Sequence, residues 1–596
     1  MRTCLPLCLS LLSAVLLPCG GLDVSDICTH CSCQYLASAH LTETICTADH
    51  PVLEVNCTTK PSVRQNPNQF LNAPTTSNAS VVVWLSYKHA GLTSLHPFAQ
   101  FSSYNVTLLS LDHNKLVYIP PRGLTALKNL HTVTASHNDI NSVAPDAFKG
   151  LKHLRYVDLS FNSLHLLDFK LVLDAVNLIS LNLRNNLVKT VIAPESPINT
   201  LESLDLSVNK IPDFPLLFFS SFPKLIYLNI SYNELGTLPA DSFHDLSKLK
   251  VLDASGIQVS ALDRKVVENL KALNRLYLSE NFLSEATFVE VLPALTALDL
   301  RRNNLTTLGD KLLSSSLQRL VISHNRLTDL SHVFKVFNQL KSLDAGWNPS
   351  TQFPEHVRAG LQELILDGTQ LRSWPAQRPG EGGIDHLSLS HIPGITALGP
   401  YAFSGILKNK NESGKCVFLK ISNTSLSTID EDAFTDIDIC KLDLSHNQLR
   451  WVPESLLRWD TLVAVDLQHN PWHCDCALQW MLSTVVPLAY RTDQQLLAEL
   501  RCASPPELAG DRLVHWYNHK ERVLCGPTKH DAMLTPKART VEDGPLPQLV
   551  VTVSSSPLMI AVLLCLSIVA AMLVILAFAL QRRALRNRKM RRNRRF

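Results

Sequence analysis

The sequence predicts an α/β solenoid, a curved horseshoe of short coils. Each coil would add one strand to a parallel concave sheet, and the convex side would be mostly irregular or short helical. Three observations predict it. A Leu-x-Leu-x-x-Asn-x-Leu pattern, as in 109–116, 157–164 (with Val first) and 442–449, returns about every 24 residues. Cysteines gather before and after the repeats, and one long apolar run lies near the C-terminus. Stacked coils share a continuous core and offer a long surface for binding.

An asparagine at the turn after each strand is the most regular feature of the repeat. The leucines before it, such as Leu181 and Leu183, have the period-2 spacing of a strand with one buried face. The turn leaves backbone groups inside the coil, and an amide side chain can both donate to and accept from them. This period and these residues are the signature of a leucine-rich repeat, with about 17 units in residues 81–470. The ladder asparagines are Asn114, Asn138, Asn162, Asn186, Asn209, Asn233, Asn281, Asn303, Asn325, Asn348, Asn447 and Asn470.

Four ladder positions depart from asparagine, and they are Ile257, Thr369, Ile392 and Thr424. The last three lie beside the longest interval of the array, 32 residues from Ile392 to Thr424. Two interpretations remain open. These units either pack with isoleucine or threonine instead, or they mark a local change of curvature with a protruding loop, 408–415, that contacts a partner.

Both ends of the chain indicate a membrane protein. Residues 1–21 read as a signal peptide, with Arg2 ahead of an apolar stretch and small residues after it. Residues 558–580 are 23 residues without a charge, roughly 35 Å as a helix, which is enough to cross a bilayer. The basic tail 581–596 would lie in the cytoplasm, so the protein would be single-pass, type I, with its bulk outside the plasma membrane. Arg586-Asn587-Arg588 looks like a retention signal, and the endoplasmic reticulum or an endosome is the alternative compartment.

Charge and composition restrict the function. Nine of the 55 basic residues lie in the last sixteen residues and Arg2 lies in the leader, which leaves 45 against 52 acidic residues. An acidic body does not favour direct binding of nucleic acid. Hydrolase, Rossmann and P-loop motifs are absent from the sequence, and a solenoid offers no deep pocket to desolvate a reaction. We therefore expect no enzyme, and no catalytic, cofactor-binding or metal residues.

Cysteine clusters predict capped ends, because terminal coils expose an apolar face that needs a cover. The N-terminal cap would be 22–80 and the C-terminal cap 471–526, followed by a juxtamembrane linker, 527–557. In a secreted chain such clusters read as disulfides, with zinc as the competing interpretation. The clusters contain Cys28, Cys31, Cys33, Cys46 and Cys57 before the repeats, and Cys474, Cys476, Cys502 and Cys525 after them.

Two further points concern the cysteines. Cys416 and Cys440 stand just ahead of strands in successive coils, where a disulfide or two buried free thiols are both compatible with the spacing. The mature outer portion would hold eleven cysteines, an odd number, so one is unpaired or bonded to another chain. Cys46 is the candidate, and it would permit a homo- or heterodimer.

The segment from Asn470 to Cys476, with Trp480, Arg501–Pro506 and Cys525, resembles the C-terminal cysteine flank of extracellular leucine-rich repeat proteins. That resemblance implies the pairs Cys474–Cys502 and Cys476–Cys525. The N-terminal match is looser, since Cys28, Cys31, Cys33 and Cys57 fit and Cys46 is extra.

The repeats themselves, for example 147–151 leading into 157–160, look like the 24-residue class of Toll-like and adhesion receptors. Sixteen residues after the predicted span are too few for a signalling domain. The resemblance therefore implies a short-tailed cell-surface receptor or adhesion protein that binds an extracellular protein through its horseshoe and signals only through a co-receptor. The alternative is a Toll-like innate immune recognition, accessory or decoy protein.

Candidate contact and modification sites complete the expectations. Aromatic residues dominate binding hot spots, which favours Trp84, Tyr277 and Trp347. Concave aspartates such as Asp158, Asp205, Asp299, Asp443 and Asp466 could attract a basic partner or simply hydrogen-bond neighbouring serines. Six of nine residues that each directly precede a ladder position are histidine, which indicates either pH-dependent binding or a common version of the repeat. These nine residues are His113, His137, Phe161, Tyr232, His324, Trp347, His391, His446 and His469. Glycosylation sequons begin at Asn56, Asn78, Asn105, Asn229, Asn304, Asn411 and Asn423.

Overall fold

The repeat array folds as a solenoid whose strands form one large sheet. The computed structural model describes residues 32–36, 52–56, 82–95, 104–172, 174–308, 316–354, 357, 360–374, 383–408, 416–517 and 523–525. All of these lie in one compact unit, Met1–Gly526. The predicted signal peptide, juxtamembrane linker, membrane span 558–580 and basic tail lie outside the described residues. Within the described part, no helix has the length and apolar character that a membrane crossing needs.

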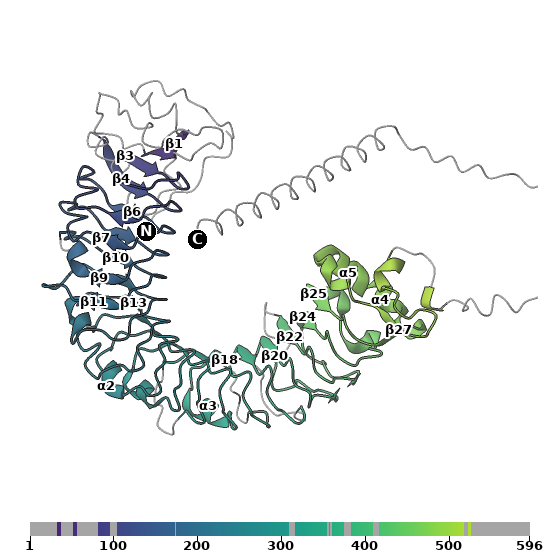
Figure 1. Cartoon of the computed structure of the whole chain (residues 1–596). Coiled ribbons are helices and arrows are strands. Elements are labelled where there is room, and N and C mark those ends of the chain that lie inside the picture. The colour runs from purple at the N-terminus through teal and green to yellow at the C-terminus, as the bar shows by residue number, and fades with distance from the viewer. Residues whose placement is uncertain are drawn as a thin grey trace, which may run out of the picture. The chain divides into compact units, whose positions relative to one another are not determined.

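The large sheet has 19 strands, of which β1 (Ser32–Leu36) and β2 (Val52–Asn56) precede the repeats and are antiparallel to each other. All later neighbours pair in parallel, and the sheet lies on the inner side of the arc that the coils form (Figure 1). The predicted parallel-sheet solenoid is therefore confirmed. The coils contribute, in order, β3 (Val82–Ser86), β4 (Asn105–Ser110), β6 (Thr132–Thr134), β8 (Tyr156–Asp158), β10 (Ser180–Asn182), β12 (Ser203–Asp205), β13 (Tyr227–Asn229), β14 (Val251–Asp253), β15 (Arg275–Tyr277), β16 (Ala297–Asp299), β17 (Arg319–Val321), β18 (Ser342–Asp344), β19 (Glu363–Ile365), β20 (His386–Ser388), β22 (Val417–Lys420), β24 (Ile439–Asp443) and β25 (Ala464–Asp466).

The outer side of the coils carries short elements, as predicted. Two-residue and three-residue strands pair in parallel between successive coils: β5 (Tyr118–Ile119) with β7 (Ser142–Val143), β9 (Leu166–Asp168) with β11 (Thr190–Ile192), and β21 (Ala397–Leu398) with β23 (Thr428–Ile429). Helical segments there are single turns: η4 (Phe169–Val172), η5 (Phe218–Ser221), α2 (Arg264–Val267), η6 (Thr287–Val291), α3 (Ser331–Val336), η7 (Glu454–Leu456) and η8 (Trp459–Thr461). Asp263 caps α2 by accepting from the Lys265 N–H at 2.9 Å.

The asparagine ladder ties each coil to the one before it. Asn233, 2% exposed, donates to the carbonyl oxygens of Leu206 in the preceding coil (3.0 Å) and Ile230 in its own (2.9 Å). Its Oδ1 accepts the Ile211 N–H of the preceding coil at 3.1 Å. One buried amide thus satisfies backbone groups on both sides of a coil junction, and this is the chemistry that selects asparagine at this turn.

The departures from asparagine weaken this link. Thr369 Oγ1 donates only within its own coil, to the Leu366 carbonyl at 2.8 Å. Ile392 is fully buried and has no polar side-chain atom, so its turn packs by apolar contact. Thr424 donates its hydroxyl to Asn447 Oδ1 of the following coil at 2.6 Å. The interpretation of drifted repeats that pack with other residues agrees with this geometry, while residues 409–415 of the proposed protruding loop lie outside the described residues.

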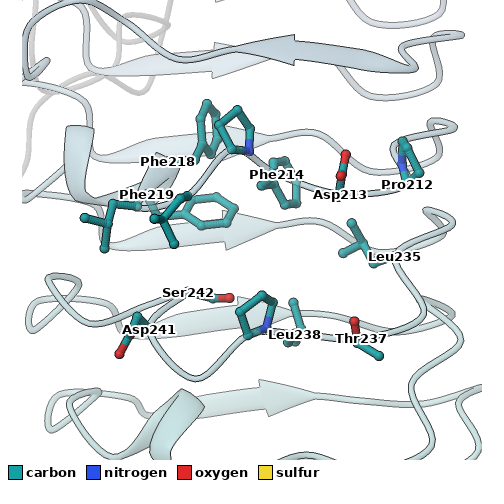
Figure 2. Close-up of a pocket in the computed structure, with 14 residues that line it drawn as sticks. Pro212, Asp213, Phe214, Phe218, Phe219, Leu235, Thr237, Leu238, Asp241 and Ser242 are labelled. Atoms are coloured by element: carbon teal, nitrogen blue, oxygen red, sulfur yellow. The ribbon is translucent and has the colours of Figure 1, made fainter.

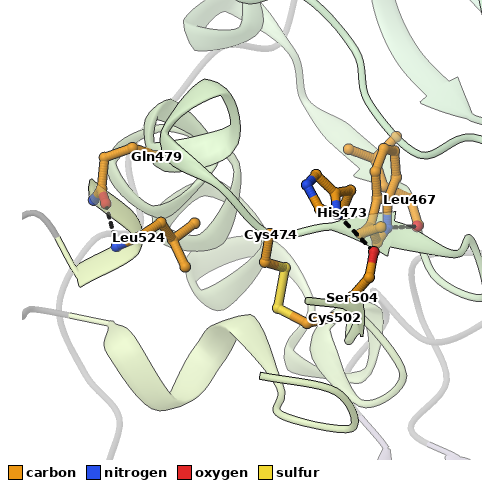
Figure 3. Close-up of a disulfide and its surroundings, with 8 residues drawn as sticks. Leu467, His473, Cys474, Gln479, Cys502, Ser504 and Leu524 are labelled. Atoms are coloured by element: carbon orange, nitrogen blue, oxygen red, sulfur yellow. Dashed lines mark hydrogen bonds between the residues drawn. A yellow bond between two sulfur atoms is a disulfide. The ribbon is translucent and has the colours of Figure 1, made fainter. Parts of the chain in front are cut away.

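The C-terminal end of the array is covered by a disulfide-linked cap (Figure 3). It contains β26 (Trp472–His473) paired with β27 (Cys502–Ser504), η9 (Cys476–Leu478), α4 (Gln479–Ser483), α5 (Val485–Thr492), η10 (Gln494–Leu497), η11 (Leu513–Trp516) and η12 (Val523–Cys525). Trp472 is fully buried and its indole N–H donates to the Leu467 carbonyl at 3.0 Å, which joins the cap to the last coil.

The disulfides follow the expected connectivity. Cys474 is joined to Cys502 and Cys476 to Cys525, with Cα atoms 5.6 and 4.5 Å apart. Zinc is excluded at these four positions, because their sulfurs are bonded to each other. Cys416 and Cys440 also form a disulfide, with Cα atoms 5.6 Å apart, rather than two free thiols. The predictions for Cys28, Cys31, Cys46 and Cys57 lie outside the described residues, and of Cys33 only the backbone, in β1, is described.

Candidate functional site

A row of left-handed residues borders the concave sheet. The residue before each ladder position has a φ between 52° and 66°, because the chain must turn sharply out of the strand there. Most of these residues are neither Gly, Asn nor Asp, so the coil imposes the conformation on them. We call this row the left-handed stripe; it consists of His89, His113, His137, Phe161, Asn185, Val208, Tyr232, Gly256, Glu280, Arg302, His324, Trp347, Gly368, His391, Asn423, His446 and His469.

Rings in the stripe stack on one another from coil to coil. His89, His113, His137 and Phe161 form one column, with successive ring centroids 4.5, 4.4 and 4.2 Å apart. Contact with its neighbours removes water from the imidazole of His113 and lowers its pKa, and charges on His137 and His89 lower it further. The nearby Asp112 carboxylate opposes this effect and Lys88 adds to it. Packing therefore accounts for histidine in this row.

The middle of the concave face contains a polar recess of about 490 Å³. It spans the turns of consecutive coils from β15 to β19, and Tyr232 of the β13 turn also lines it. We call it the central recess. Its lining residues are Tyr232, Ser279, Glu280, Arg301, Arg302, Ser323, His324, Asp344, Gly346, Trp347, Ile365 and Asp367.

Trp347 is the aromatic residue with the firmest position in the recess. Its side chain is 47% exposed, and His324 stacks parallel to it at 5.5 Å between ring centroids, with 5° between the planes. On the other side the indole lies over Gly368, and His391 approaches it at 5.5 Å. Neighbours on both sides hold the ring in one orientation, which reduces the entropy that a partner would lose by ordering it.

The basic residues of the recess are already paired. Arg301 binds Asp299 through two nitrogens, at 2.9 and 2.6 Å. Arg302 lies 3.5 Å from Glu280. Two carboxylates then remain without a cationic side chain in contact among the residues described: Asp344 at the end of β18 and Asp367 just after β19.

Those two carboxylates are held by neutral donors. Asp344 accepts from the Ser323 hydroxyl at 2.9 Å and the Gly346 N–H at 3.1 Å. Asp367 accepts from the Ser388 hydroxyl and the Ser390 N–H, both at 2.7 Å. Burial raises the pKa of the Asp344 carboxyl above its usual range, and the charge on Asp367 adds to the rise, while these hydrogen bonds and Arg301 oppose it.

The other predicted contact residues lie elsewhere on the sheet. Trp84 is in β3 at the start of the array, half-buried, and Tyr277 is in β15, between Asp253 and Asp299 of the neighbouring strands. Of the three candidates, Trp347 alone lines the central recess. The concave aspartates cap the backbone two residues on: Asp158, for example, accepts the Ser160 N–H at 2.8 Å, and Asp443 accepts the Ser445 N–H and hydroxyl. Sequence reasoning did not select Asp344 and Asp367, which the recess brings together.

The sequons occupy different environments. Asn229 is 4% exposed, and its Oδ1 accepts from both the N–H and the hydroxyl of Ser231. Asn423 is exposed and lies in the left-handed stripe. Asn56, Asn105 and Asn304 are half-buried, whereas Asn78 and Asn411 lie outside the described residues.

A second hollow, about 110 Å³ and mostly apolar, lies between the segments that follow β12 and β13 (Figure 2). Phe214, Phe218, Phe219 and Leu238 converge on it, and Leu216 beside it is 82% exposed. It offers little room and few polar groups, so the central recess is the stronger candidate for a binding site.

Comparison with known proteins agrees with the repeat architecture. The family description "Leucine rich repeat" matches residues 128–188, 199–259 and 293–349. The chain is 35% identical to lumican of Oryctolagus cuniculus over 185 residues, which cover 30% of this chain and 91% of that protein. It is 29% identical to podocan-like protein 1 of Mus musculus over 329 residues, covering 49% of this chain and 57% of that protein.

Two further similarities extend over a larger share of the chain. CD180 antigen of Mus musculus is 29% identical over 334 residues, which cover 53% of this chain and 45% of that protein. The structure of a leucine-rich repeat protein of Leptospira interrogans superposes with a TM-score of 0.52, 21% identity, and coverage of 68% of this chain and 94% of that chain. The matches to podocan-like protein 1 and CD180 antigen thus span about half the length of those relatives. With its coil geometry, its asparagine ladder and these similarities, the chain belongs to the leucine-rich repeat superfamily.

Proposed function

We propose that this protein is a cell-surface leucine-rich repeat receptor or adhesion protein that binds an extracellular protein partner through its concave face. The observation that most supports this proposal is the central recess, an open hollow in which the half-exposed Trp347 is held in place among charged residues. Rigid aromatic residues of this kind are the usual anchors of protein interfaces. The predicted signal peptide, membrane span and basic segment after it support a type I protein of the plasma membrane, which acts together with a co-receptor.

A glycan placed on either side of the solenoid tests this proposal. Arg275→Asn combined with Tyr277→Thr creates an Asn-x-Thr sequon at an exposed position of β15, on the concave face next to the recess, and we call this double substitution the concave-glycan variant. Asp245→Asn creates a matched sequon at an exposed position on the outer side of a coil. Surface biotinylation and a mobility shift removed by glycosidase would establish that both variants reach the cell surface and carry the added glycan.

Proximity labelling on living cells then reads out the neighbouring proteins. We expect the concave-glycan variant to lose specific neighbours that the wild-type protein and Asp245→Asn retain, because only the concave glycan blocks the sheet. An unchanged set of neighbours for the concave-glycan variant would show that the concave face is not the binding surface.

The similarity to CD180 antigen favours a second candidate, an innate immune recognition, accessory or decoy protein. The same labelling distinguishes the two. Signalling receptors of immune cells among the neighbours lost by the concave-glycan variant would support the second candidate, and adhesion proteins of an adjacent cell would support the first.

A further inference from the structure

At one end, the central recess has two carboxylates that form no ion pair with a described residue. Arg301 and Arg302 are each committed to a carboxylate, Asp299 and Glu280. Asp344 and Asp367 lie in adjacent coils of the same recess, and their charges repel each other, which contributes to the raised pKa of Asp344. A cation placed between them would remove this repulsion.

Asp344 has an apolar neighbour in each adjacent strand, whereas most of the other residues of the recess are polar. Register places Val321 of β17 on one side of Asp344 and Ile365 of β19 on the other, all in the concave row of the sheet. By contrast, Asp205 lies between Asn182 and Asn229 in the same row. A ligand that reaches Asp344 therefore needs apolar groups along its length and a charge at its end.

A missing side chain leaves Asp344 open. In the coil of β24, the Ser445 hydroxyl covers the Asp443 carboxylate at 2.6 Å. Gly346 holds the corresponding position after Asp344, and a β-carbon built there would meet the Asp367 carbonyl oxygen at 2.8 Å and Asp344 Oδ1 at 3.4 Å. Glycine is thus required for close packing of the two coils, and it also leaves the carboxylate without a hydroxyl from its own coil.

The indole of Trp347 forms the remaining wall. It follows Gly346 directly, and His324 and Gly368 fix its orientation. Lysine and arginine combine an apolar stem with a charged end, so they match the walls and the carboxylates together.

We propose that the central recess receives a lysine or arginine side chain of the protein partner, with the stem between Val321 and Ile365 and the charged end at Asp344 and Asp367 beside Trp347. This proposal rests on the proposed function, because it names the chemistry that the concave face recognises. Asp344 supplies the principal contact, and Asp367 raises the negative potential around it.

The test uses the full-length purified chain and tetravalent peptide probes, in which one central residue is arginine, lysine, citrulline or norleucine within the same Gly-Ser sequence. Citrulline and norleucine keep the shape of the stem and lack the charge. We expect arginine and lysine probes to bind at least tenfold more tightly than their neutral counterparts, with an affinity that falls as salt rises. Equal binding of charged and neutral probes would overturn the proposal.

Neutral variants locate the site. Asp344→Asn keeps the fold, since asparagine already occupies this strand position at Asn182 and Asn229 and caps Arg184 and Ser231 there. We expect Asp344→Asn and Asp367→Asn each to weaken binding of the arginine probe at least fivefold. Asp466→Asn is the matched control, because Asp466 has the same strand position and a pKa also raised by burial, while His469 takes the place of the tryptophan. An equal loss in Asp466→Asn would mean that overall charge, and not this recess, binds the probe.

The two proposals fail separately. If the concave-glycan variant loses its neighbours on cells while Asp344→Asn and Asp367→Asn keep them, the concave face binds a partner but not through a basic side chain in the recess. If the concave-glycan variant keeps its neighbours, the proposed function itself is wrong.

Discussion

The indole of Trp347 lies so close over Gly368 of the next coil that a β-carbon at Gly368 would come within 2.4 Å of the ring. Tyr232 lies over Gly256 in the same manner, at 2.7 Å. Both glycines belong to the left-handed stripe, with φ of 66° and 62°. Large rings in this stripe therefore lean along it toward the following coil, and a glycine there provides the space.

We expect Gly368→Ala to displace the indole and lower the free energy of unfolding well beyond the cost of its backbone conformation. Gly150→Ala is the matched control, since Gly150 has a φ of 79° and nothing within 4 Å of a built β-carbon. Both substitutions carry the left-handed cost of roughly 1–2 kcal/mol, and only Gly368→Ala adds a steric clash. Denaturant titration followed by tryptophan fluorescence measures both, and equal shifts of the midpoint would contradict the packing described here.

The asparagine ladder predicts that removing one buried amide side chain lowers the free energy of unfolding more than removing an exposed one. Asn233→Ala leaves the Ile230 carbonyl and the Ile211 N–H without their side-chain partner, while the Leu206 carbonyl keeps its hydrogen bond from Asn209. Each buried unsatisfied group costs about 1–3 kcal/mol, so we expect a loss of about 2 kcal/mol or more. Asn177→Ala removes one exposed hydrogen bond, to the Lys152 carbonyl, and should change stability by less than about 1 kcal/mol. Chemical denaturation compares the two, and a similar loss in both variants would argue against the ladder as the main link.

We expect glycans only on those sequons whose asparagine side chain is exposed. Asn229 is buried and its amide oxygen is engaged by Ser231, so we expect it to carry no glycan. Asn423 is exposed, so we expect it to be glycosylated. Mass spectrometry of peptides released by glycosidase in heavy-oxygen water marks each occupied site. A glycan on Asn229 would mean that the β13 coil does not close as described.

Stacked histidines should make the first coils sensitive to acid. The folded state lowers the pKa of His113 below its usual 6.5, so the unfolded chain binds a proton more readily. Neutral His113 therefore contributes its full share to the stability of the folded state above pH 6.5, and this share is lost as the pH falls through 6.5 toward the lower pKa of the folded state. His113→Phe keeps a ring in the column, as Phe161 does, and removes the titration.

We therefore expect the melting temperature of the full chain to fall less between about pH 7.5 and 5.5 in His113→Phe than in the wild type. Phe161→His extends the imidazole column and should have the opposite effect. Identical pH dependence in all three proteins would show that His113 titrates as in the unfolded chain.

The repeating part of the fold is predictable from sequence because each rule acts locally. The spacing of Leu181 and Leu183 predicts a strand, and Asn186 predicts the turn that follows it. The buried position of both leucines and the hydrogen bonds of Asn186 agree with those rules. Register needs no further information, because identical coils align their equivalent residues.

The recess was harder to predict because it depends on contacts between coils. Trp347 stood out as a large aromatic residue, but nothing in the pattern showed that Gly368 makes room for its ring. Asp344 occupies the same strand position as Asp158 and was not selected, since Ala345 follows it where other coils have leucine. Asp367 lies two residues later in its coil, so the approach of the two carboxylates appears only when coils are stacked.

The disulfide between Cys416 and Cys440 bridges the β22 and β24 coils, where Asn447 still donates to the Ile421 carbonyl, and it adjoins the β20–β22 junction, which lacks a ladder asparagine because Thr424 takes that position. It closes a segment of 24 residues, for which chain entropy corresponds to roughly 3 kcal/mol of stability. Replacing both cysteines by serine should therefore make the β22 and β24 coils the first to open. Hydrogen exchange should accelerate in 417–443, while the β6 to β12 coils exchange as before, because coils of a solenoid contact only their neighbours. Uniform acceleration along the array would instead show that the solenoid unfolds as one cooperative unit, and no acceleration would show that Thr424 and its bond to Asn447 suffice to hold this junction.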